Sequence, residues 1–545
     1  MTNTVILLGF LLDLAVAAPM LRGRVRPTLI GRRRFLLWAS GTVVAVLAIA
    51  TLAADGARLP VPERVRQIGF VEWTVVAALV LVAVAVVVAR SLGTRDPDPL
   101  EWEARAAHAP RGGRSRRELA VVLAILTVVS LTTTAVVSHT DSLLLKSYWT
   151  IGAGVLAACL LAFLVGRRFT HLPVSPGKVL CIVPVFNEPA DSLARTVEAL
   201  LAQTVPVDVI VIDDGSDTPV VPTIVHERLR WWRHPNTGKR GAQVAVLRQI
   251  PRDTYDFILT VDSDSAPFPD ACEHLLRAMS NSRVQAATGM LYVRNYRESF
   301  VSMAADIDIG SSCVMMRASR SMLGSLETTS GALALYRSAI LYDHLDAYAV
   351  ECGTGDDRWL ALRALRRGEV VAVAEAGVET DMPTTLRGTY RQRVRWARSW
   401  WWMLPYVFRN FGPRQMISPL FGMVQLIVAP VVVAGSIGAL CGVTLPASDA
   451  GAQRVLVMYV GAYLAVRYGL CALYLSGRPH VSRRAKIVLL LAGTPLAILL
   501  NLVLLAPTRY IALFRLTDNR WRTRQSDPNR RAAAGSRAGA GTVTG

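Results

Sequence analysis

The chain has 545 residues, of which 52% are hydrophobic and only 18% are charged, and Lys and Arg outnumber Asp and Glu by 60 to 40. Several long apolar runs exclude an ordinary soluble protein, and the hydrophobic content excludes a disordered chain. A net charge of +20 is compatible with nucleic-acid binding, but here the arginines flank the apolar runs, which is the pattern of membrane topology. The composition therefore predicts a membrane protein that contacts lipids and has no nucleic-acid partner.

Five apolar runs precede residue 170, each near the length of about 20 residues that a transmembrane helix needs: residues 5–20, 35–54, 70–89, 119–137 and 149–166. The loops after the first and third runs are rich in arginine, whereas the alternate loops are not. The positive-inside rule then places the N-terminus outside and the chain after Gly166 in the cytosol of a multi-pass cell-membrane protein.

Residues 167–414 contain no run that qualifies as a span, so this block is the predicted cytosolic domain, with interfacial helices near 385–410. Two further spans are expected at 416–443 and 455–475. The last run, residues 487–514, contains two prolines and has basic residues on both sides, which predicts a re-entrant or interfacial pair of helices; a simple eighth span is the alternative. Residues 515–545 form a basic cytosolic tail.

The cytosolic block begins with a repeating pattern of strands and helices. Residues 179–185, 207–212 and 257–261 are apolar runs typical of buried strands, and residues 190–204 have helical spacing of their apolar side chains. This order predicts an open parallel α/β sheet, which binds ligands at the carboxyl ends of its strands.

Acidic side chains follow two of these strands and recur before a later helix: Asp213, Asp214, Asp262, Asp264, Asp356 and Asp357. Carboxylates that share a cleft repel one another unless a cation is present, and oxygen ligands suit Mg²⁺ or Mn²⁺. The seven cysteines are spaced singly, which argues against a zinc site and a disulfide framework. Lys239, Arg240 and Arg395 are candidates for holding a diphosphate. Taken one at a time, the D-x-D turn and these cations are also typical of a solvated surface.

An ordered set of motifs connects these residues: 184–188 (PVFNE), 213–216 (DDGS), 238–240 (GKR), 262–264 (DSD), 330–331 (SG), 355–358 (GDDR), 392–396 (QRVRW) and 521–524 (WRTR). The set resembles the processive membrane glycosyltransferases of family 2, which include hyaluronan, chitin and cellulose synthases, and is most similar to the hyaluronan synthases. Arg522 departs from the glycine of the last motif, and five apolar runs before the cytosolic block exceed the two usual spans.

The resemblance implies a GT-A nucleotide-binding fold, inserted between helical membrane regions, and a role for each motif. Asp357 matches the general base, with Asp356 as its support. The nucleotide-sugar ligands would be Glu188, Asp214, Lys239, Arg240, Asp262, Gln392, Arg395, Trp521, Thr523 and Arg524. Asp264 and Asp262 would bind the metal, and Ser330, Gly331 and Trp396 would lie at the acceptor. Gly355–Asp357 is also the pattern of a helix start, and both interpretations can hold together.

Two features lie near the predicted membrane surface. Trp396, Trp400, Trp401 and Trp402 form an aromatic cluster, in which we assign Trp396 to the site and the other three to an interfacial belt. Arg467 lies within a predicted span, where it would face a hydrated polymer path or pair with Asp13.

These patterns predict a processive inverting β-glycosyltransferase that polymerises sugar from a UDP-sugar donor into a hyaluronan-like or chitin-like polysaccharide and passes the chain across the membrane. Its acceptor would be a polysaccharide or a lipid. Two alternatives remain open: transfer of a single sugar to a lipid carrier, and an inactive nucleotide-sugar-binding scaffold. The sequence indicates neither the sugar nor a protein partner.

Overall fold

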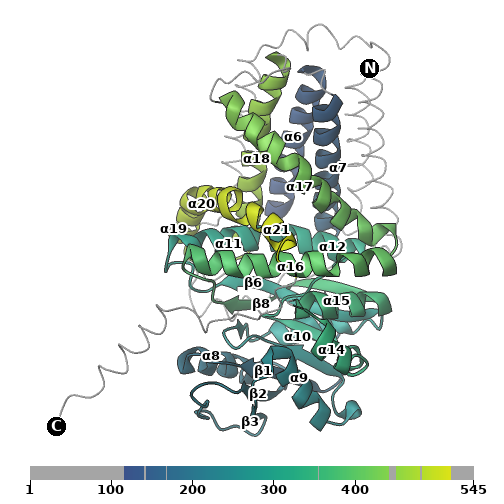
Figure 1. Ribbon diagram of the computed structural model, residues 1–545, viewed down its shortest axis with the longest axis vertical. Helices are drawn as coiled ribbons and strands as arrows, with labels where there is room; N and C mark the ends of the chain where they lie inside the picture. The colour runs from purple at the N-terminus through teal and green to yellow at the C-terminus, as the bar shows by residue number, and fades with distance from the viewer. Residues whose placement is uncertain are drawn as a thin grey trace, which may run out of the picture.

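The computed structural model describes residues 116–139, 143–166, 169–353, 355–440, 450–478 and 481–516. The first three predicted spans, Asp13 and the 521–524 motif lie outside these residues. In the described part, a block of helices stands above an α/β domain, and a layer of helices separates the two (Figure 1).

The α/β domain is built on an eight-stranded sheet with the order β3-β2-β1-β4-β7-β6-β8-β5. The strands are β1 (Val179–Val185), β2 (Asp208–Asp214), β3 (Leu229–His234), β4 (Phe257–Thr260), β5 (Ala266–Pro267), β6 (Val284–Val293), β7 (Ala334–Arg337) and β8 (Glu369–Thr380). The predicted strands at 179–185, 207–212 and 257–261 are confirmed as β1, β2 and β4. The expected parallel pairing is confirmed for these three strands, but the whole sheet is mixed, because β7 pairs antiparallel with both β4 and β6, and β5 pairs antiparallel with β8.

Both faces of the sheet are covered, which explains the continuous apolar runs of its strands. On one face, β1 packs through Cys181 and Val183 against α8 (Ala190–Leu201) and α10 (Ala271–Met279). On the other face, Leu180 and Ile182 pack against α9 (Gly238–Gln249) and α15 (Asp356–Arg367). Shorter elements complete this domain: η1 (Arg252–Thr254), α13 (Ser338–Tyr342) and α14 (Leu345–Glu351). Helix α12 (Ala318–Leu323) lies in the layer of helices above the sheet (Figure 1).

The helical block contains α6 (Arg116–His139), α7 (Leu143–Val165), α17 (Pro413–Leu440) and α18 (Ala450–Ser476), which coincide with four of the predicted spans. By length and composition alone, two helical segments of the described chain could cross a membrane, Lys146–Leu164 and Arg483–Leu513. The layer beneath contains α11 (Phe300–Ser312), which continues into η2 (Cys313–Arg317), and α16 (Leu386–Asn410).

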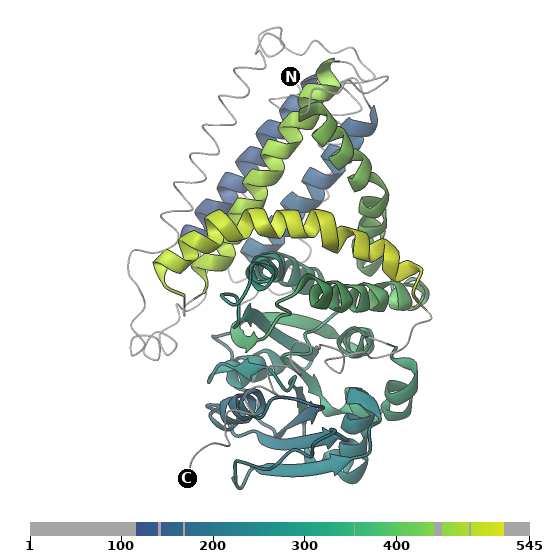
Figure 2. The same cartoon turned by 60° about the vertical axis from the view of Figure 1, so that its left-hand side comes forward.

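The last apolar run differs from the predicted pair of helices. It forms one continuous helical segment made of α19 (Arg483–Val488), η3 (Leu489–Gly493), α20 (Thr494–Leu500), η4 (Asn501–Leu505) and α21 (Ala506–Leu513). The segment lies across the layer of α11 and α16 instead of standing with α6 and α18 (Figure 2). A π-helical turn precedes each proline, Pro495 and Pro507, and its wider hydrogen-bond spacing accommodates a residue that cannot donate.

Candidate functional site

The site lies where the end of β4 meets the starts of α9 and α15. Lys239, the second residue of α9, places its Nζ 2.6 Å from Oδ1 of Asp262 and 2.9 Å from Oδ2 of Asp356. Gly238 begins α9 with a φ of +82°, a conformation that glycine adopts without strain. Three segments that are distant in sequence thus bring one ammonium and two carboxylates together.

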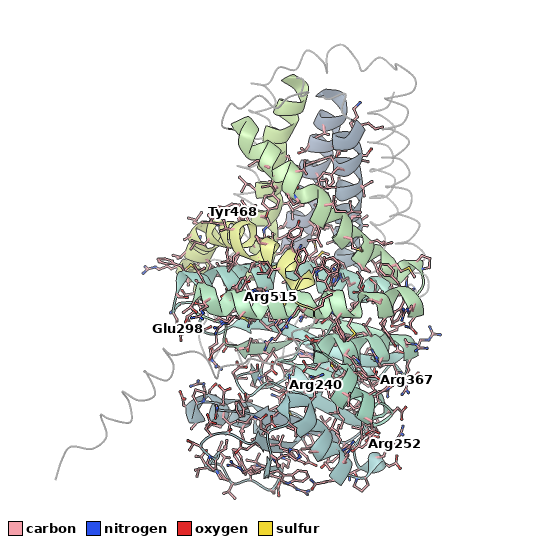
Figure 3. The ribbon with its side chains drawn as sticks, viewed as in Figure 1. Arg240, Arg252, Glu298, Arg367, Tyr468 and Arg515 are labelled. Atoms are coloured by element: carbon pink, nitrogen blue, oxygen red, sulfur yellow. The ribbon has the colours of Figure 1, made fainter. Side chains whose placement is uncertain are left out.

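Two arginines add positive charge to this cluster. Arg395 on α16 is buried, which lowers its pKa, and the charges of Asp356, Asp262, Asp357 and Asp264 act in the opposite direction. Arg240, the neighbour of Lys239, hydrogen-bonds the Cys352 thiol and lies near Asp356; Figure 3 labels it within the α/β domain. The predicted diphosphate ligands Lys239, Arg240 and Arg395 therefore all lie at the same acidic cluster.

Asp357 lies in the first turn of α15, and its surroundings hold it in place. The N–H of Arg358 donates to Oδ1 of Asp357 at 2.8 Å, and Oγ1 of Thr329 donates to the Asp357 carbonyl at 3.0 Å. Burial, and then the negative charge of Asp356, raise the pKa of Asp357 above its ordinary value. Asp356 behaves differently: burial acts to raise its pKa, but the Lys239 ammonium lowers it overall. The pKa values of these two neighbouring carboxyl groups are thus shifted in opposite directions.

Asp264 is the most deeply buried member of the D-x-D turn. Its Oδ1 accepts hydrogen bonds from Ser265 Oγ at 3.2 Å and Thr380 Oγ1 at 3.3 Å. Burial, and then the charges of Asp262 and Asp381, raise the pKa of Asp264 to about 7. The carboxylate oxygens of Asp262 and Asp264 are of the ligand type that suits a divalent cation such as Mg²⁺ or Mn²⁺. No group of three or more His, Cys, Asp or Glu residues in the described chain is arranged to hold a metal alone, so a bound diphosphate would have to complete the ligand set.

The aspartates at the end of β2 do not follow the expectation that all six aspartates share one cleft. Asp213 accepts hydrogen bonds from the N–H groups of Ser216 and Val220 and pairs with Arg233 at 3.2 Å, so it stabilises the turn after β2. Asp214 accepts from the N–H of Thr237, just before α9, at 2.9 Å. Asp213 is therefore held within its own turn, whereas Asp214 reaches the start of the helix that carries Lys239.

Glu188, after β1, reaches the D-x-D turn, because Ser263 Oγ donates to its Oε2 at 2.9 Å. Gly331 also lies beside the cluster: a Cβ at this position would be 3.0 Å from Oδ2 of Asp262 and 3.3 Å from Nζ of Lys239. Ser330, by contrast, is held through its backbone, whose N–H donates to Oγ1 of Thr288.

The side chains of the 392–396 motif on α16 point in different directions. Gln392 contacts the sulfur of Met382 at 3.7 Å, while Arg395 faces the acidic cluster. The indole of Trp396 is 37% exposed, and the Arg393 guanidinium lies 4.5 Å from its ring centroid. Of the other tryptophans, Trp401 donates from Nε1 to the carbonyl of Arg509 on α21. Trp521, Thr523 and Arg524 lie outside the described residues.

Sequence reasoning missed two groups of residues. Arg294 and Asp381 form a two-pronged ion pair beside Asp264, at 3.2 and 2.7 Å, and no motif indicated them. Arg467 contacts Asp308 on α11, a partner that was not considered. A carboxylate inside the apolar segment of α11 is unusual, and that signal could have identified Asp308.

Comparisons with known proteins concern the domain that carries this site. Residues 176–399 match the family model described as "Glycosyltransferase like family 2". This region is therefore similar to the glycosyltransferases of family 2, and the structure gives it an α/β architecture.

The relatives are synthases and transferases of this kind. A hyaluronan synthase of Streptococcus pyogenes serotype M3 is 30% identical over 277 residues, which are 46% of this chain and 65% of that protein. An N-acetylglucosaminyltransferase of Rhizobium meliloti is 28% identical over 369 residues, covering 64% of this chain and 81% of that protein. The chain is thus a homologue of hyaluronan synthases, although its match spans less than two thirds of their length. A solved structure, the mannosyltransferase PcManGT from Pyrobaculum calidifontis in complex with GDP-Man and Mn²⁺, aligns with 70% of this chain and 99% of its own at 17% identity and a TM-score of 0.42.

Proposed function

We propose that this chain is a processive, inverting β-glycosyltransferase that extends a hyaluronan-like or chitin-like polysaccharide from a UDP-sugar and passes it across the cell membrane. One observation carries the proposal: Lys239, Asp262 and Asp356 meet within 3 Å contacts, at a cluster that Arg395 of the Q-x-x-R-W motif also faces. A diphosphate would account for the positive groups of this cluster, and a divalent cation bound with it would account for the carboxylates.

The donor would bind along the strand ends. Glu188 and Asp214 would contact the uridine, and Lys239, Arg240 and Arg395 the diphosphate, whose negative charge increases as the sugar leaves. Fixed cations in a buried site stabilise this developing charge, because no solvent has to reorganise around them. Gln392 would orient the donor beside Arg395. Trp521, Thr523 and Arg524 of the tail would close over the nucleotide.

A divalent ion, Mg²⁺ or Mn²⁺, would be held by Asp264 and Asp262. When bound, such an ion neutralises the leaving diphosphate as a Lewis acid. The contribution of the protein is to keep the Asp264 oxygens oriented through Ser265 and Thr380 and to keep their surroundings dry.

Asp357 would act as the general base. Inversion needs one carboxylate to take the proton of the acceptor hydroxyl while UDP leaves from the opposite face of the sugar. A raised pKa makes Asp357 a stronger proton acceptor than an ordinary aspartate, and the hydrogen bond from Arg358 fixes its orientation. Asp356, with its lowered pKa, would stay ionised and hold Lys239.

The acceptor would be the growing polysaccharide, with Gly331 and Ser330 beside the donor and the half-exposed Trp396 indole under a sugar ring. Helices α6, α7, α17 and α18 would cross the membrane, with the α/β domain in the cytosol and the α19–α21 segment at the interface. The exposed side chains of α17 support contact with lipid, because Leu420, Val424, Ile427 and Val431 form one apolar stripe at 49, 48, 75 and 66% exposure.

The test is a sugar panel with the purified full chain in nanodiscs. We expect UDP release and a ladder of labelled products with UDP-GlcNAc and UDP-GlcA together, for a hyaluronan-like copolymer, or with UDP-GlcNAc or UDP-Glc alone, for a homopolymer. A single sugar on lipid would replace the polymerase with a lipid-directed transferase. Binding of UDP-sugars without UDP release, with Asp357→Asn equal to wild type, would leave a nucleotide-sugar-binding scaffold and overturn the proposal.

A further inference from the structure

Helix α11 carries two buried carboxylates in an otherwise apolar stretch, Asp306 and Asp308. The helix lies in the layer between the sheet and the upper helices, next to α18 and α20 (Figure 2). Burying a carboxylate costs free energy unless a cation or hydrogen-bond donors offset the loss of hydration. Asp306 and Asp308 each have such partners, but the partners come from different elements.

Asp306 fixes α11 to the sheet. Its carboxylate accepts from Arg478 at 2.5 Å and from the Tyr474 hydroxyl at 2.7 Å, and Arg478 also donates to the carbonyl of Val293, the last residue of β6. The Asp306 and Arg478 side chains are 0 and 3% exposed. This pair therefore gives α11 a defined position relative to the sheet and to the end of α18.

Asp308 receives side chains from three other elements. Its oxygens lie 3.5 Å from Nη2 of Arg393 on α16, 3.8 Å from Nη2 of Arg467 on α18, and 3.1 Å from Nδ2 of Asn501 on η4. The Asp308 side chain is 11% exposed and both arginines are 13% exposed. At 3.5 and 3.8 Å the two arginine contacts are ion pairs without hydrogen bonds, and they draw two buried guanidinium groups toward one carboxylate.

Arg393 continues this arrangement toward the site. Its guanidinium lies 4.5 Å from the ring centroid of Trp396, three residues further along α16 and on the same helix face. A planar guanidinium that is held over an indole restricts the rotamers of that indole. The opposite face of the half-exposed ring is then presented in one orientation.

We propose that Asp308 is a positioning residue, which orients the Trp396 indole for the acceptor sugar through the Arg393 guanidinium. This inference rests on the proposed function for the role of Trp396, but the orientation itself does not. Arg467 and Asn501 share the same carboxylate, so α18 and the α19–α21 segment also determine where Arg393 lies. Helices outside the glycosyltransferase domain thereby contribute to the orientation of the Trp396 indole.

The first measurement separates donor chemistry from acceptor binding. In Asp308→Asn and Arg393→Gln we expect the KM for an acceptor oligosaccharide to rise about tenfold, the order expected for one lost cation–π contact together with the rotamer freedom it restores. The slow hydrolysis of UDP-sugar by water, and its KM, should stay within about twofold of wild type. Arg393→Lys keeps the charge but loses the planar stack, so it should fall between wild type and Arg393→Gln.

The matched control is Asp346→Asn, which removes a carboxylate that is 89% exposed and pairs with Arg248 of α9. It should leave both reactions unchanged. If Asp308→Asn alters donor hydrolysis as strongly as transfer, or leaves the acceptor KM unchanged, the positioning role is wrong.

A second measurement needs no activity. Hydroxyl-radical footprinting with mass spectrometry should show faster oxidation of Trp396 in Asp308→Asn and Arg393→Gln, with Trp359, buried in the domain core, still protected as a test of folding. Unchanged oxidation of Trp396 would overturn the inference. If no UDP-sugar is turned over by wild type but the footprint changes as expected, the proposed function fails while the positioning by Asp308 stands.

Discussion

The Lys239 ammonium lies 2.6 Å from Oδ1 of Asp262, so the start of α9 and the end of β4 are joined by an ion pair at the centre of the site. Burial acts to lower the pKa of Lys239, but the charges of Asp262 and Asp356 raise it above its ordinary value. The lysine therefore stays protonated throughout the physiological range. A phosphate that entered the site would meet a cation already in place.

Replacing this cation should damage both activity and stability. Lys239→Met leaves Asp262 and Asp356 without their shared partner, and we expect UDP release to fall about 10²-fold, as for the loss of one preorganised donor. The loss of stability should stay below the roughly 3–5 kcal/mol of a fully buried pair, since the Asp262 side chain is 39% exposed. Lys239→Arg should recover part of both. Thermal unfolding and a UDP-release assay check these values, and a fully active Lys239→Met variant would contradict them.

The pH profile of the reaction should report the Asp357 carboxyl. A general base works only when deprotonated, so the rate should fall as the pH falls through the pKa of Asp357. Because burial and Asp356 raise that pKa, the acidic limb should lie above the value of about 3.9 typical of aspartate. Asp357→Asn should lower kcat by about 10²–10⁴-fold and abolish this limb. A limb that persists in Asp357→Asn would show that another titrating group, such as Asp264, controls the rate.

The sequence could predict features that depend on residues close together in the chain, but not those that depend on contacts between distant residues. The strands β1 and β4 are apolar runs bounded by turn residues, which is local information, and both were predicted correctly. The direction of β7 was not predicted, because it depends on pairing between Leu259 and Leu335, which are far apart in the chain.

The same limit applies to single residues. Asp213 is the penultimate residue of β2 and Asp262 comes just after β4, so both lie at the carboxyl end of a buried strand. Asp213 accepts from the Ser216 N–H of its own turn, whereas Asp262 meets Lys239 from another helix, and only the folded chain distinguishes the two. Arg393 lay within a recognised motif, but its partner Asp308 is distant in sequence and carries no motif.

Removal of divalent ions should stop transfer. Burial, and then the negative charge of Asp262, raise the pKa of Asp264, so a cation that neutralises both carboxylates should bind more tightly to the wild type than to Asp264→Asn. We expect EDTA to abolish UDP release, and added Mg²⁺ or Mn²⁺ to restore it. Mn²⁺ binding followed by electron paramagnetic resonance, with UDP present, should weaken about tenfold or more in Asp264→Asn. Full activity in EDTA would remove the metal from the proposed reaction.

Gly355, just before α15, packs closely against Ser399 of α16, and the small size of both residues should allow α15 to pack on α16. A Cβ at Gly355 would overlap the Ser399 side chain, and no other residue can relieve the overlap without moving the helix that begins with Asp356 and Asp357. Gly355→Ala should therefore lower both the unfolding temperature and UDP release. Ser399→Gly costs about 1 kcal/mol alone, because glycine is unfavourable inside a helix. The double variant Gly355→Ala, Ser399→Gly should nevertheless be more stable and more active than Gly355→Ala, since the overlap is removed. Strictly additive losses in the four-protein cycle would show that the two positions do not touch and that α15 is seated by other contacts.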